Sequence, residues 1–289
     1  MKEIVKEKIA SLLSGDEEIL SVEQLGGMTN QNYLVQTSSN RYIVKFFGKG
    51  TDKLIDRQNE KFNLELLKDL KLDVENYLFD IEAGIKVNQY IENAETLNLN
   101  TIKTKFEEIA PILQTIHASG KELKGEFAPF EEIKKYESLI QGEISYPNYE
   151  AVRKSVFSLK EELEQIGIEK KSCHIDLVPE NFIESPDGHL YLIDWEYSSM
   201  NDPMWDLAAL FLESEFTPEE EEDFLAHYES EKTPVSREKI RIYKILQDII
   251  WSLWTIYKEE NGADFGDYGI TRYNRAVKEL QSQGGIDED

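Results

Sequence analysis

The sequence is poor in cysteine, in positive charge and in long apolar runs. Its 289 residues include one cysteine, Cys173, so an intramolecular disulfide is excluded and a reducing compartment is favoured. Lys and Arg number 32 against 57 Asp and Glu; the net charge of −25 argues against a nucleic-acid-binding protein. No stretch approaches the roughly 18 apolar residues of a membrane span, and the first ten residues are half charged, unlike a signal peptide. We therefore predict a cytoplasmic protein without membrane insertion.

The negative charge is unevenly distributed along the chain. Residues 1–91 hold 12 basic and 15 acidic residues, a net charge of −3, whereas residues 92–289 hold 20 and 42, a net charge of −22. Solvated helix faces account for most such charge in proteins. The alternative is that the acidic part raises the local concentration of a cationic ligand.

The apolar pattern changes near residue 91. Before it, an opening amphipathic helix ends near residue 14, strands are expected at 18–25, 32–37, 42–47 and on both sides of 83–84, and a helix is expected around 54–67. After it, helices are expected at 101–119, 130–142, 148–165, 203–213, 217–230, 235–259 and 270–282, and only 171–175, 181–184 and 190–193 look extended. The pattern predicts an α+β chain of two domains, 1–91 with a five-stranded antiparallel sheet and 92–289 mainly helical.

A glycine pair lies between the first two predicted strands, at residues 26–27, followed by Met28, Thr29 and Asn30. Glycines let backbone N–H groups approach a phosphate closely, because no Cβ stands in the way. The P-loop pattern is absent, since no Gly-Lys-Ser/Thr follows. Most such pairs are turns, so the segment is either a phosphate-binding loop or a plain hairpin connection.

Lys45 lies in the middle of the third predicted strand, among apolar neighbours. A lysine in such a strand is usually an exposed side chain. Glu60, early in the following predicted helix, is a candidate partner, and Glu65 on the same helix competes with it. A strand lysine held by a helix glutamate and aimed at nucleotide phosphates is the arrangement of protein-kinase N-lobes.

Two acidic motifs follow in the second predicted domain. Residues 174–181 have the pattern His-x-Asp-x4-Asn, in which a short loop after a strand aims Asp176 at a substrate hydroxyl while Asn181 reaches a metal ion. An apolar strand then ends abruptly in Asp194, and a carboxylate there suits Mg²⁺ bound to ATP phosphates. Taken singly, Asp194 is a turn residue; the order of the motifs favours phosphoryl transfer.

Two tryptophans, Trp251 and Trp254, are three residues apart on an almost wholly apolar predicted helix. Composition alone favours core packing. The alternative is a site for a quaternary ammonium group, which has no N–H to donate and is bound by cation–π attraction, apolar contact and a carboxylate.

Together these motifs resemble the aminoglycoside-phosphotransferase/choline-kinase branch of the protein-kinase-like fold, and bacterial choline kinases in particular, over almost the whole chain. The resemblance is carried by residues 26–30, 55–60, 89–91, 174–181, 193–199 with Asp206, and 251–254. It implies a two-lobed kinase fold that uses ATP and Mg²⁺ to phosphorylate choline.

The resemblance implies roles for individual residues. Asp176 is the base that orients the acceptor hydroxyl, Asn181 and Asp194 hold Mg²⁺, and His174 anchors the catalytic loop. The nucleotide is bound by Gly27, Thr29 and Asn30 in the glycine loop, by Lys45 paired with Glu60, and by the backbone of Gln89 and Ile91 at adenine. Choline is bound by Asp176, Tyr197, Trp205, Glu213, Trp251, Trp254 and Tyr268.

Other functions stay open on the sequence. An ethanolamine kinase, or an aminoglycoside or other small-alcohol phosphotransferase, fits the same motifs, although the paired tryptophans favour choline. A nucleotide-binding pseudokinase is disfavoured because Lys45, Asp176, Asn181 and Asp194 are all present. A metalloprotein using His174 and Asp176 is disfavoured because the four histidines lack zinc spacing. We expect a monomer or homodimer.

Overall fold

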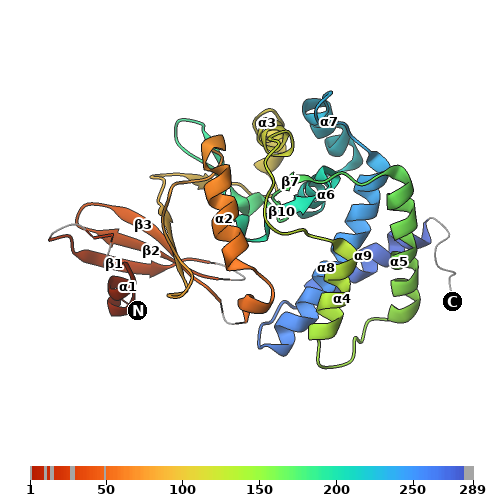
Figure 1. Cartoon of the computed structure of the whole chain (residues 1–289), viewed down its shortest axis with the longest axis horizontal. Helices are drawn as coiled ribbons and strands as arrows, with labels where there is room; N and C mark the ends of the chain where they lie inside the picture. Colours follow the sequence, from red (N-terminus) through yellow and green to blue (C-terminus); the bar gives the residue numbers. More distant parts are fainter. Residues whose placement is uncertain (1, 10–11, 14–15, 27–29, 49, 283–289) are drawn as a thin grey trace. The chain divides into compact units, whose positions relative to one another are not determined.

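The computed structural model describes residues 2–9, 12–13, 16–26, 30–48 and 50–282, and the chain forms two compact units (Figure 1). The first unit comprises Met1–Thr101 and Pro179–Tyr197, and the second comprises Ile102–Val178 and Ser198–Asp289. The predicted boundary at residue 91 therefore needs correction, because a later segment returns to the first unit. Its strands β8 (Phe182–Glu184) and β9 (Leu190–Leu192) pair with β6 (Glu95–Thr96) in a three-stranded sheet, which fixes the segment there.

The larger sheet of the first unit has the predicted five antiparallel strands. They run in the order β1 (Ile19–Gln24), β2 (Gln31–Thr37), β3 (Arg41–Phe46), β5 (Ile85–Gln89) and β4 (Asn76–Asp80). The helices of this unit are α1 (Lys2–Ile9) and α2 (Arg57–Leu67), with short 3₁₀ turns η1 (Thr51–Lys53), η2 (Lys68–Leu70), η4 (Pro179–Asn181) and η5 (Trp195–Tyr197).

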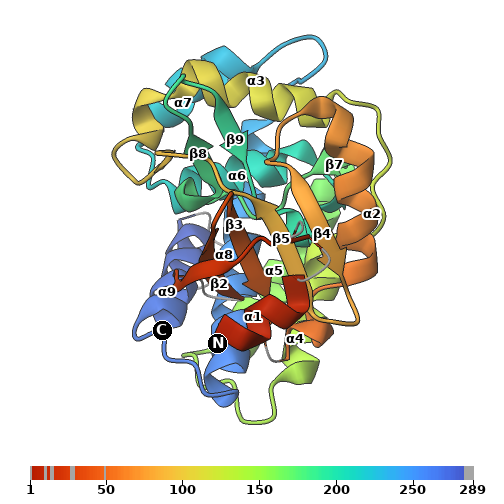
Figure 2. The same ribbon diagram turned by 90° about the vertical axis from the view of Figure 1, so that its left-hand side faces the viewer.

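Strand register separates the two faces of this sheet. Val44 lies opposite Val87, and both belong to the apolar core that α1 covers through Val5 (Figure 2). Successive side chains of a strand point to opposite faces. The next pair, Lys45 opposite Lys86, therefore faces the other side, on which α2 lies. The sheet thus has one apolar face and one face that carries two adjacent lysines.

The second unit is mainly helical, as predicted. Its helices are α3 (Phe106–His117), α4 (Pro129–Leu139), α5 (Tyr149–Ile166), α6 (Pro203–Glu213), α7 (Pro218–Tyr228), α8 (Arg237–Glu260) and α9 (Tyr268–Gln281), and α3 is preceded by the 3₁₀ turn η3 (Ile102–Thr104). All seven predicted helices are confirmed, with ends that differ by a few residues. The pair β7 (Lys171–Cys173) and β10 (Ser199–Asn201) completes the unit, and β10 was not predicted.

Helix α8 is the centre of the second unit. Both α4 and α9 pack along it, as does α6, and α8 is buried on most sides (Figure 1). Side-chain caps define where the neighbouring helices begin: Asp202 caps α6, Ser236 caps α8, and Thr217 forms a capping box with Glu220 on α7. Among the helices that the structure describes, none is long and apolar enough to cross a membrane.

Candidate active site

The lysine-bearing face of the sheet holds a buried charge cluster in the first unit. Lys45 Nζ lies 2.6 Å from Asp194 Oδ1, whereas Glu60 accepts from Lys86 Nζ at 2.9 Å and from Arg57 Nη1 at 2.6 Å. The predicted Lys45–Glu60 pair is therefore wrong. Lys86 lies across from Lys45 on the neighbouring strand and is only 1% exposed. Because a buried charge needs an opposite charge beside it, Lys86 pairs with the buried carboxylate of Glu60. Burial raises the pKa of Glu60, but Lys86 and Arg57 outweigh it and hold that pKa below its ordinary value.

Arg57, at the first turn of α2, ties the cluster to the segment after Asp194. Its Nη1 donates to Glu196 Oε2 at 2.9 Å and its Nη2 to Asn30 Oδ1 at 3.0 Å, while Asn30 Nδ2 donates to Glu196 Oε2 at 2.7 Å. All three side chains are buried. The guanidinium lies 4.1 Å from the ring centre of Phe47. Burial, followed by the charge of Asp194, raises the pKa of Glu196. The network fixes the backbone two residues beyond Asp194.

Arg57 was part of a sequence motif but was not among the predicted site residues. Its position three residues before Glu60 is the one signal that could have found it, because residues at that spacing share a helix face. The side chain of Asn30 is engaged in this network, and the predicted nucleotide contact of that residue stays a prediction. Gly27 and Thr29, the other predicted residues of the glycine loop, lie outside the described residues.

A hairpin brings the two predicted metal ligands to adjoining loops. Phe182 of β8 pairs with Leu192 of β9, and just beyond this pair the Ile193 N–H donates to the Asn181 carbonyl at 2.8 Å. Asp194 follows with a φ of 66°, in the left-handed region that aspartate tolerates better than most residues. The backbone therefore turns sharply where the carboxylate leaves the strand end.

The donor set at this hairpin fits Mg²⁺. An amide oxygen from Asn181 and a carboxylate from Asp194 are the hard oxygen ligands that Mg²⁺ prefers. The Asp194 side chain is 25% exposed and already has a cation, the ammonium of Lys45, within 2.6 Å of one oxygen. These residues suit a cation that bridges to nucleotide phosphates.

The predicted adenine-binding segment, Gln89 to Ile91, begins at the last residue of β5. The Gln89 N–H donates to the Glu75 carbonyl at 2.8 Å, and the Ile91 carbonyl accepts from the Ala94 N–H at 3.3 Å. The Gln89 N–H is thus used within the protein, so the proposed adenine contacts are the carbonyl of Gln89 and the N–H of Ile91. These contacts stay predictions.

In the second unit, a strained turn presents Asp176. Ile175 has a φ of 77°, which is unfavourable for a β-branched residue and costs about 1–3 kcal/mol. The fully buried carboxylate of Asp206 holds the turn by accepting the N–H groups of His174 and Ile175, each at 2.8 Å. Trp205 Nε1 donates to the Ile175 carbonyl at 3.0 Å. Hydrogen bonds thus fix both the N–H and the carbonyl of Ile175, while Asp176 itself remains partly exposed.

The predicted role of Trp205 in choline binding is wrong. Its side chain is completely buried and packs against Phe127 and Tyr243. It cannot touch a ligand from that position. The indole instead fixes the backbone next to Asp176, a role that the sequence order of Trp205 and Asp206 did not reveal.

Three buried side chains with metal-binding atoms lie around the same turn: His117, Cys173 and Asp206. His117 Nε2 lies 3.1 Å from Asp206 Oδ2, and its Nδ1 lies 2.7 Å from the Tyr228 hydroxyl. Burial raises the pKa of the Cys173 thiol, so the sulfur stays protonated. Hydrogen bonds therefore explain why these three side chains lie together. The group supports the turn at Ile175.

Four aromatic side chains form a continuous row in the second unit, here called the aromatic row: Trp251, Trp254, Phe265 and Tyr268. Successive ring centres lie 6.5, 5.0 and 6.4 Å apart. The two tryptophans are 9% and 6% exposed, and the other two are partly exposed. Phe265 lies in the loop before α9 and was not predicted, because nothing in that loop's pattern fixes its register.

Tyr268 connects the aromatic row to a charged network that includes Arg272 and Glu213. Burial, the largest influence, raises the pKa of Tyr268, and the charges of Glu213 and Asp176 add to the rise. Arg272 Nη1 donates to the Tyr268 hydroxyl at 2.9 Å, and its Nη2 donates to Glu213 Oε1 at 2.5 Å. Predicted residues Asp176, Glu213, Trp251, Trp254 and Tyr268 thus belong to one unit. Tyr197, on η5, belongs to the first unit, and its role stays a prediction.

Comparisons with known proteins agree on one family. The family model for choline/ethanolamine kinases matches residues 22–277. The crystal structure of the choline kinase LicA from Streptococcus pneumoniae is 76% identical, covers 98% of this chain and 99% of its own, and superposes with a TM-score of 0.94. A structure of LicA in complex with AMP gives 76% identity, a TM-score of 0.92 and coverage of 97% and 98%. The protein LicA from Haemophilus influenzae is 31% identical over 269 residues, 89% of this chain and 79% of that protein.

Proposed function

The chain belongs to the choline/ethanolamine kinase family, and from that premise we propose that it is an ATP-dependent choline kinase. It transfers the γ-phosphoryl group of ATP to the hydroxyl of choline and releases phosphocholine and ADP. The protein-kinase-like fold predicted from the sequence is the fold of the solved choline kinase that it resembles at 76% identity.

The observation that carries the choice of acceptor is the aromatic row. A trimethylammonium group donates no hydrogen bond and is bound by aromatic faces, apolar contact and a nearby carboxylate. Trp251, Trp254, Phe265 and Tyr268 supply the faces, and Glu213 supplies the carboxylate. Asp176 belongs to the same unit as the aromatic row, and its charge is among those that raise the pKa of Tyr268; we call the row and this proposed base together the acceptor region.

The proposed mechanism uses positioning and charge more than covalent chemistry, as phosphoryl transfer generally does. Asp176 orients the choline hydroxyl and accepts its proton. Lys45 contacts the nucleotide phosphates, for which it leaves the Asp194 carboxylate. Asn181 and Asp194 hold Mg²⁺, which when bound neutralises charge on the phosphates. Arg57 and Glu196 keep the Asp194 loop in place during turnover.

Nucleotide use has independent support. One of the similar structures is a LicA complex with AMP, which is consistent with an adenine nucleotide in this chain. The backbone of Gln89 and Ile91 is the proposed adenine contact. We keep the monomer or homodimer and the cytoplasmic location as proposals.

Ethanolamine is the second candidate acceptor, because the family includes both kinases. A primary ammonium needs hydrogen-bond acceptors, and the Glu213 carboxylate and the Tyr268 hydroxyl are acceptors beside the aromatic row. The ratio of kcat/KM for the two amino alcohols decides between them.

The test is a coupled assay of ADP release with Mg²⁺ present and absent, over choline, ethanolamine and an aminoglycoside such as spectinomycin. We expect the highest kcat/KM with choline, no turnover without Mg²⁺, and a loss of at least about a hundredfold in kcat for Asp176→Asn. Equal kcat/KM for choline and ethanolamine, or a preference for the aminoglycoside, would overturn the assignment.

A further inference from the structure

An ion-pair chain runs through α8 and α9 to the acceptor region. Arg275 donates to both oxygens of Asp248, each at 2.6 Å. Asp248 Oδ1 lies 3.4 Å from Arg272 Nε, which makes no hydrogen bond in the described structure. Arg272 in turn donates to Glu213 and Tyr268. The order Arg275, Asp248, Arg272, Glu213 alternates in sign, so each interior charge is shared between two opposite charges.

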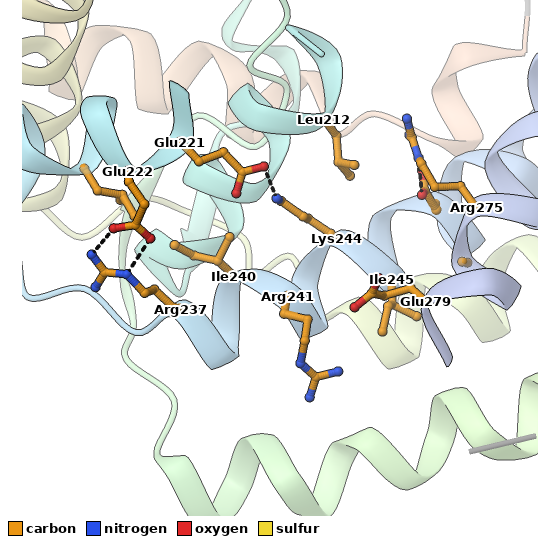
Figure 3. Close-up of a pocket in the computed structure, with 13 residues that line it drawn as sticks. Leu212, Glu221, Glu222, Arg237, Ile240, Arg241, Lys244, Ile245, Arg275 and Glu279 are labelled. Atoms are coloured by element: carbon orange, nitrogen blue, oxygen red, sulfur yellow. Dashed lines mark hydrogen bonds and ion pairs between the residues drawn. The ribbon is translucent and has the colours of Figure 1, made fainter. Parts of the chain in front are cut away.

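The outer end of this chain lies in a cavity of about 350 Å³ among α6, α7, α8 and α9 (Figure 3). Asp248 and Arg275 line it, and so do two further ion pairs, Arg237 with Glu222 and Lys244 with Glu221. Among the described residues, the pair of Arg275 with Asp248 is the one that continues to the acceptor region, through Arg272. The Arg275 side chain is 43% exposed, whereas that of Asp248 is 2% exposed. The cavity thus supplies a test pair and a control pair: Arg275 with Asp248 is connected to the aromatic row through Arg272, whereas Arg237 with Glu222 is exposed and has no such connection among the described residues.

Arg272 changes what the acceptor region offers to an ammonium group. Its two Nη groups use acceptor positions on Glu213 and on the Tyr268 hydroxyl, and its charge lies beside both. A primary ammonium must replace its three hydrogen bonds to water, and it finds these acceptors already engaged by a competing cation. A trimethylammonium group has no N–H and depends on aromatic faces, so it loses much less. The contact with Arg272 therefore selects against the primary amine.

We propose that Arg272, held by Asp248 and Arg275, is a specificity-determining residue that makes the acceptor region prefer choline to ethanolamine. This inference rests on the proposed choline kinase function. Arg272 acts through Glu213 and Tyr268 and is a positioning residue, because it engages the groups that would otherwise bind a primary ammonium. The preference is a difference between two affinities, obtained by penalising the competitor.

The ion-pair chain predicts opposite effects for two substitutions. In Arg275→Gln, Asp248 loses its bidentate partner and draws Arg272 toward itself, which weakens the hold on Glu213 and Tyr268. We expect kcat/KM for ethanolamine relative to choline to rise by about threefold to tenfold. In Asp248→Asn, Arg272 keeps Glu213 as its carboxylate partner. The ratio of kcat/KM for ethanolamine to that for choline should therefore not exceed the wild-type ratio, while KM rises for both amines. Arg237→Gln breaks an ion pair of the same cavity and should leave the ratio unchanged.

The experiment measures kcat and KM for choline, ethanolamine and ATP in the full-length wild type and the three variants. The proposal is supported if Arg275→Gln raises kcat/KM for ethanolamine relative to choline through KM of the amines, with kcat for choline and KM for ATP within about twofold, and a fall in that ratio overturns it. It is overturned if Arg275→Gln and Arg237→Gln give the same ratio as the wild type. Since Arg275 is half exposed, its variant should fold even if Asp248→Asn does not. A wild type that phosphorylates neither amine contradicts the proposed function itself, which separates the two failures.

Discussion

Replacing Asp206 with asparagine is the sharpest test of how the catalytic turn is held. The buried carboxylate accepts three hydrogen bonds, from the N–H groups of His174 and Ile175 and from His117 Nε2. Asparagine keeps one oxygen and turns an NH₂ toward one of the backbone donors. One buried N–H is then unpaired, at a cost of about 1–3 kcal/mol, and the remaining bonds lose about 1 kcal/mol of charge assistance. The expected loss in the free energy of unfolding is about 2–4 kcal/mol.

The same substitution should reduce activity beyond its effect on stability. Ile175 holds a strained φ of 77° because Asp206 and Trp205 fix its peptide. When one of these bonds is lost the turn relaxes, and a displacement of about 1 Å at Asp176 reduces kcat by roughly a hundredfold. KM for ATP should stay within about twofold of the wild type, since the residues proposed to bind the nucleotide belong to the other unit.

The assay pairs urea denaturation with steady-state kinetics at a temperature where the variant is folded. Asp202→Asn is the matched control, because Asp202 is equally buried at the N-cap of the same helix and accepts from Lys239 and from the backbone N–H groups of Met204 and Glu169. We expect both variants to be destabilised and only Asp206→Asn to lose kcat. If the two lose stability and retain the same kcat, the carboxylate of Asp206 does not position Asp176, and the reasoning is refuted.

Three further predictions concern the acceptor region, packing and pH. Trp254→Leu should raise KM for choline by about threefold to thirtyfold, with KM for ATP unchanged, because it removes a cation–π face but keeps an apolar side chain; loss of both affinities together would mean that the indole is a core residue only. Gly269→Ala should destabilise the protein and raise KM for choline. A Cβ at this position would lie 2.6 Å from the Tyr146 hydroxyl and 3.0 Å from Thr255, which would force the start of α9 away from α8. Unchanged kinetics and an unchanged free energy of unfolding would contradict this packing. Desolvation raises the pKa of Asp73 from 3.8 to about 7, so the folded state binds the proton more tightly than the unfolded chain. This contribution to stability is present below about pH 4 and is lost as pH rises to about 7. Asp73→Asn should flatten that part of the stability profile measured by urea denaturation, and an unaltered slope would show that the pKa of Asp73 is not raised in the folded state.

The parts of the fold that sequence reasoning predicted are those set by local pattern. The alternation of apolar residues in Tyr33, Val35, Tyr42 and Val44 is typical of strands with one buried face, and it gave the correct sheet. Helices α6 to α9 were found because their apolar spacing is long and regular. The division into two units could not be predicted in this way, because it depends on β8 and β9 returning to pair with β6. Such short strands carry almost no periodic signal.

The candidate site divides in the same way. Asp176, Asn181 and Asp194 could be proposed as site residues from the sequence because their spacing reflects a loop and a hairpin that are local in sequence, and their roles stay predictions. The errors concern long-range partners. Glu60 pairs with Lys86 and not with Lys45, since two lysines on neighbouring strands compete for one carboxylate.

Residues with no motif of their own were missed altogether. Arg272 lies 59 residues from Glu213 in the chain, and Phe265 lies in an irregular loop. Trp205 was misassigned because sequence cannot distinguish an indole that touches a ligand from one that supports the backbone of Ile175. Each of these positions becomes visible only when α6, α8 and α9 are packed together.

The most direct test of the account is the product of the reaction itself, followed by ³¹P NMR with ATP, Mg²⁺ and choline. We predict one phosphocholine for each ADP formed by the wild type and none by Asp176→Asn. Formation of ADP and inorganic phosphate without phosphocholine would contradict the claim that the aromatic row and Asp176 present choline to the nucleotide.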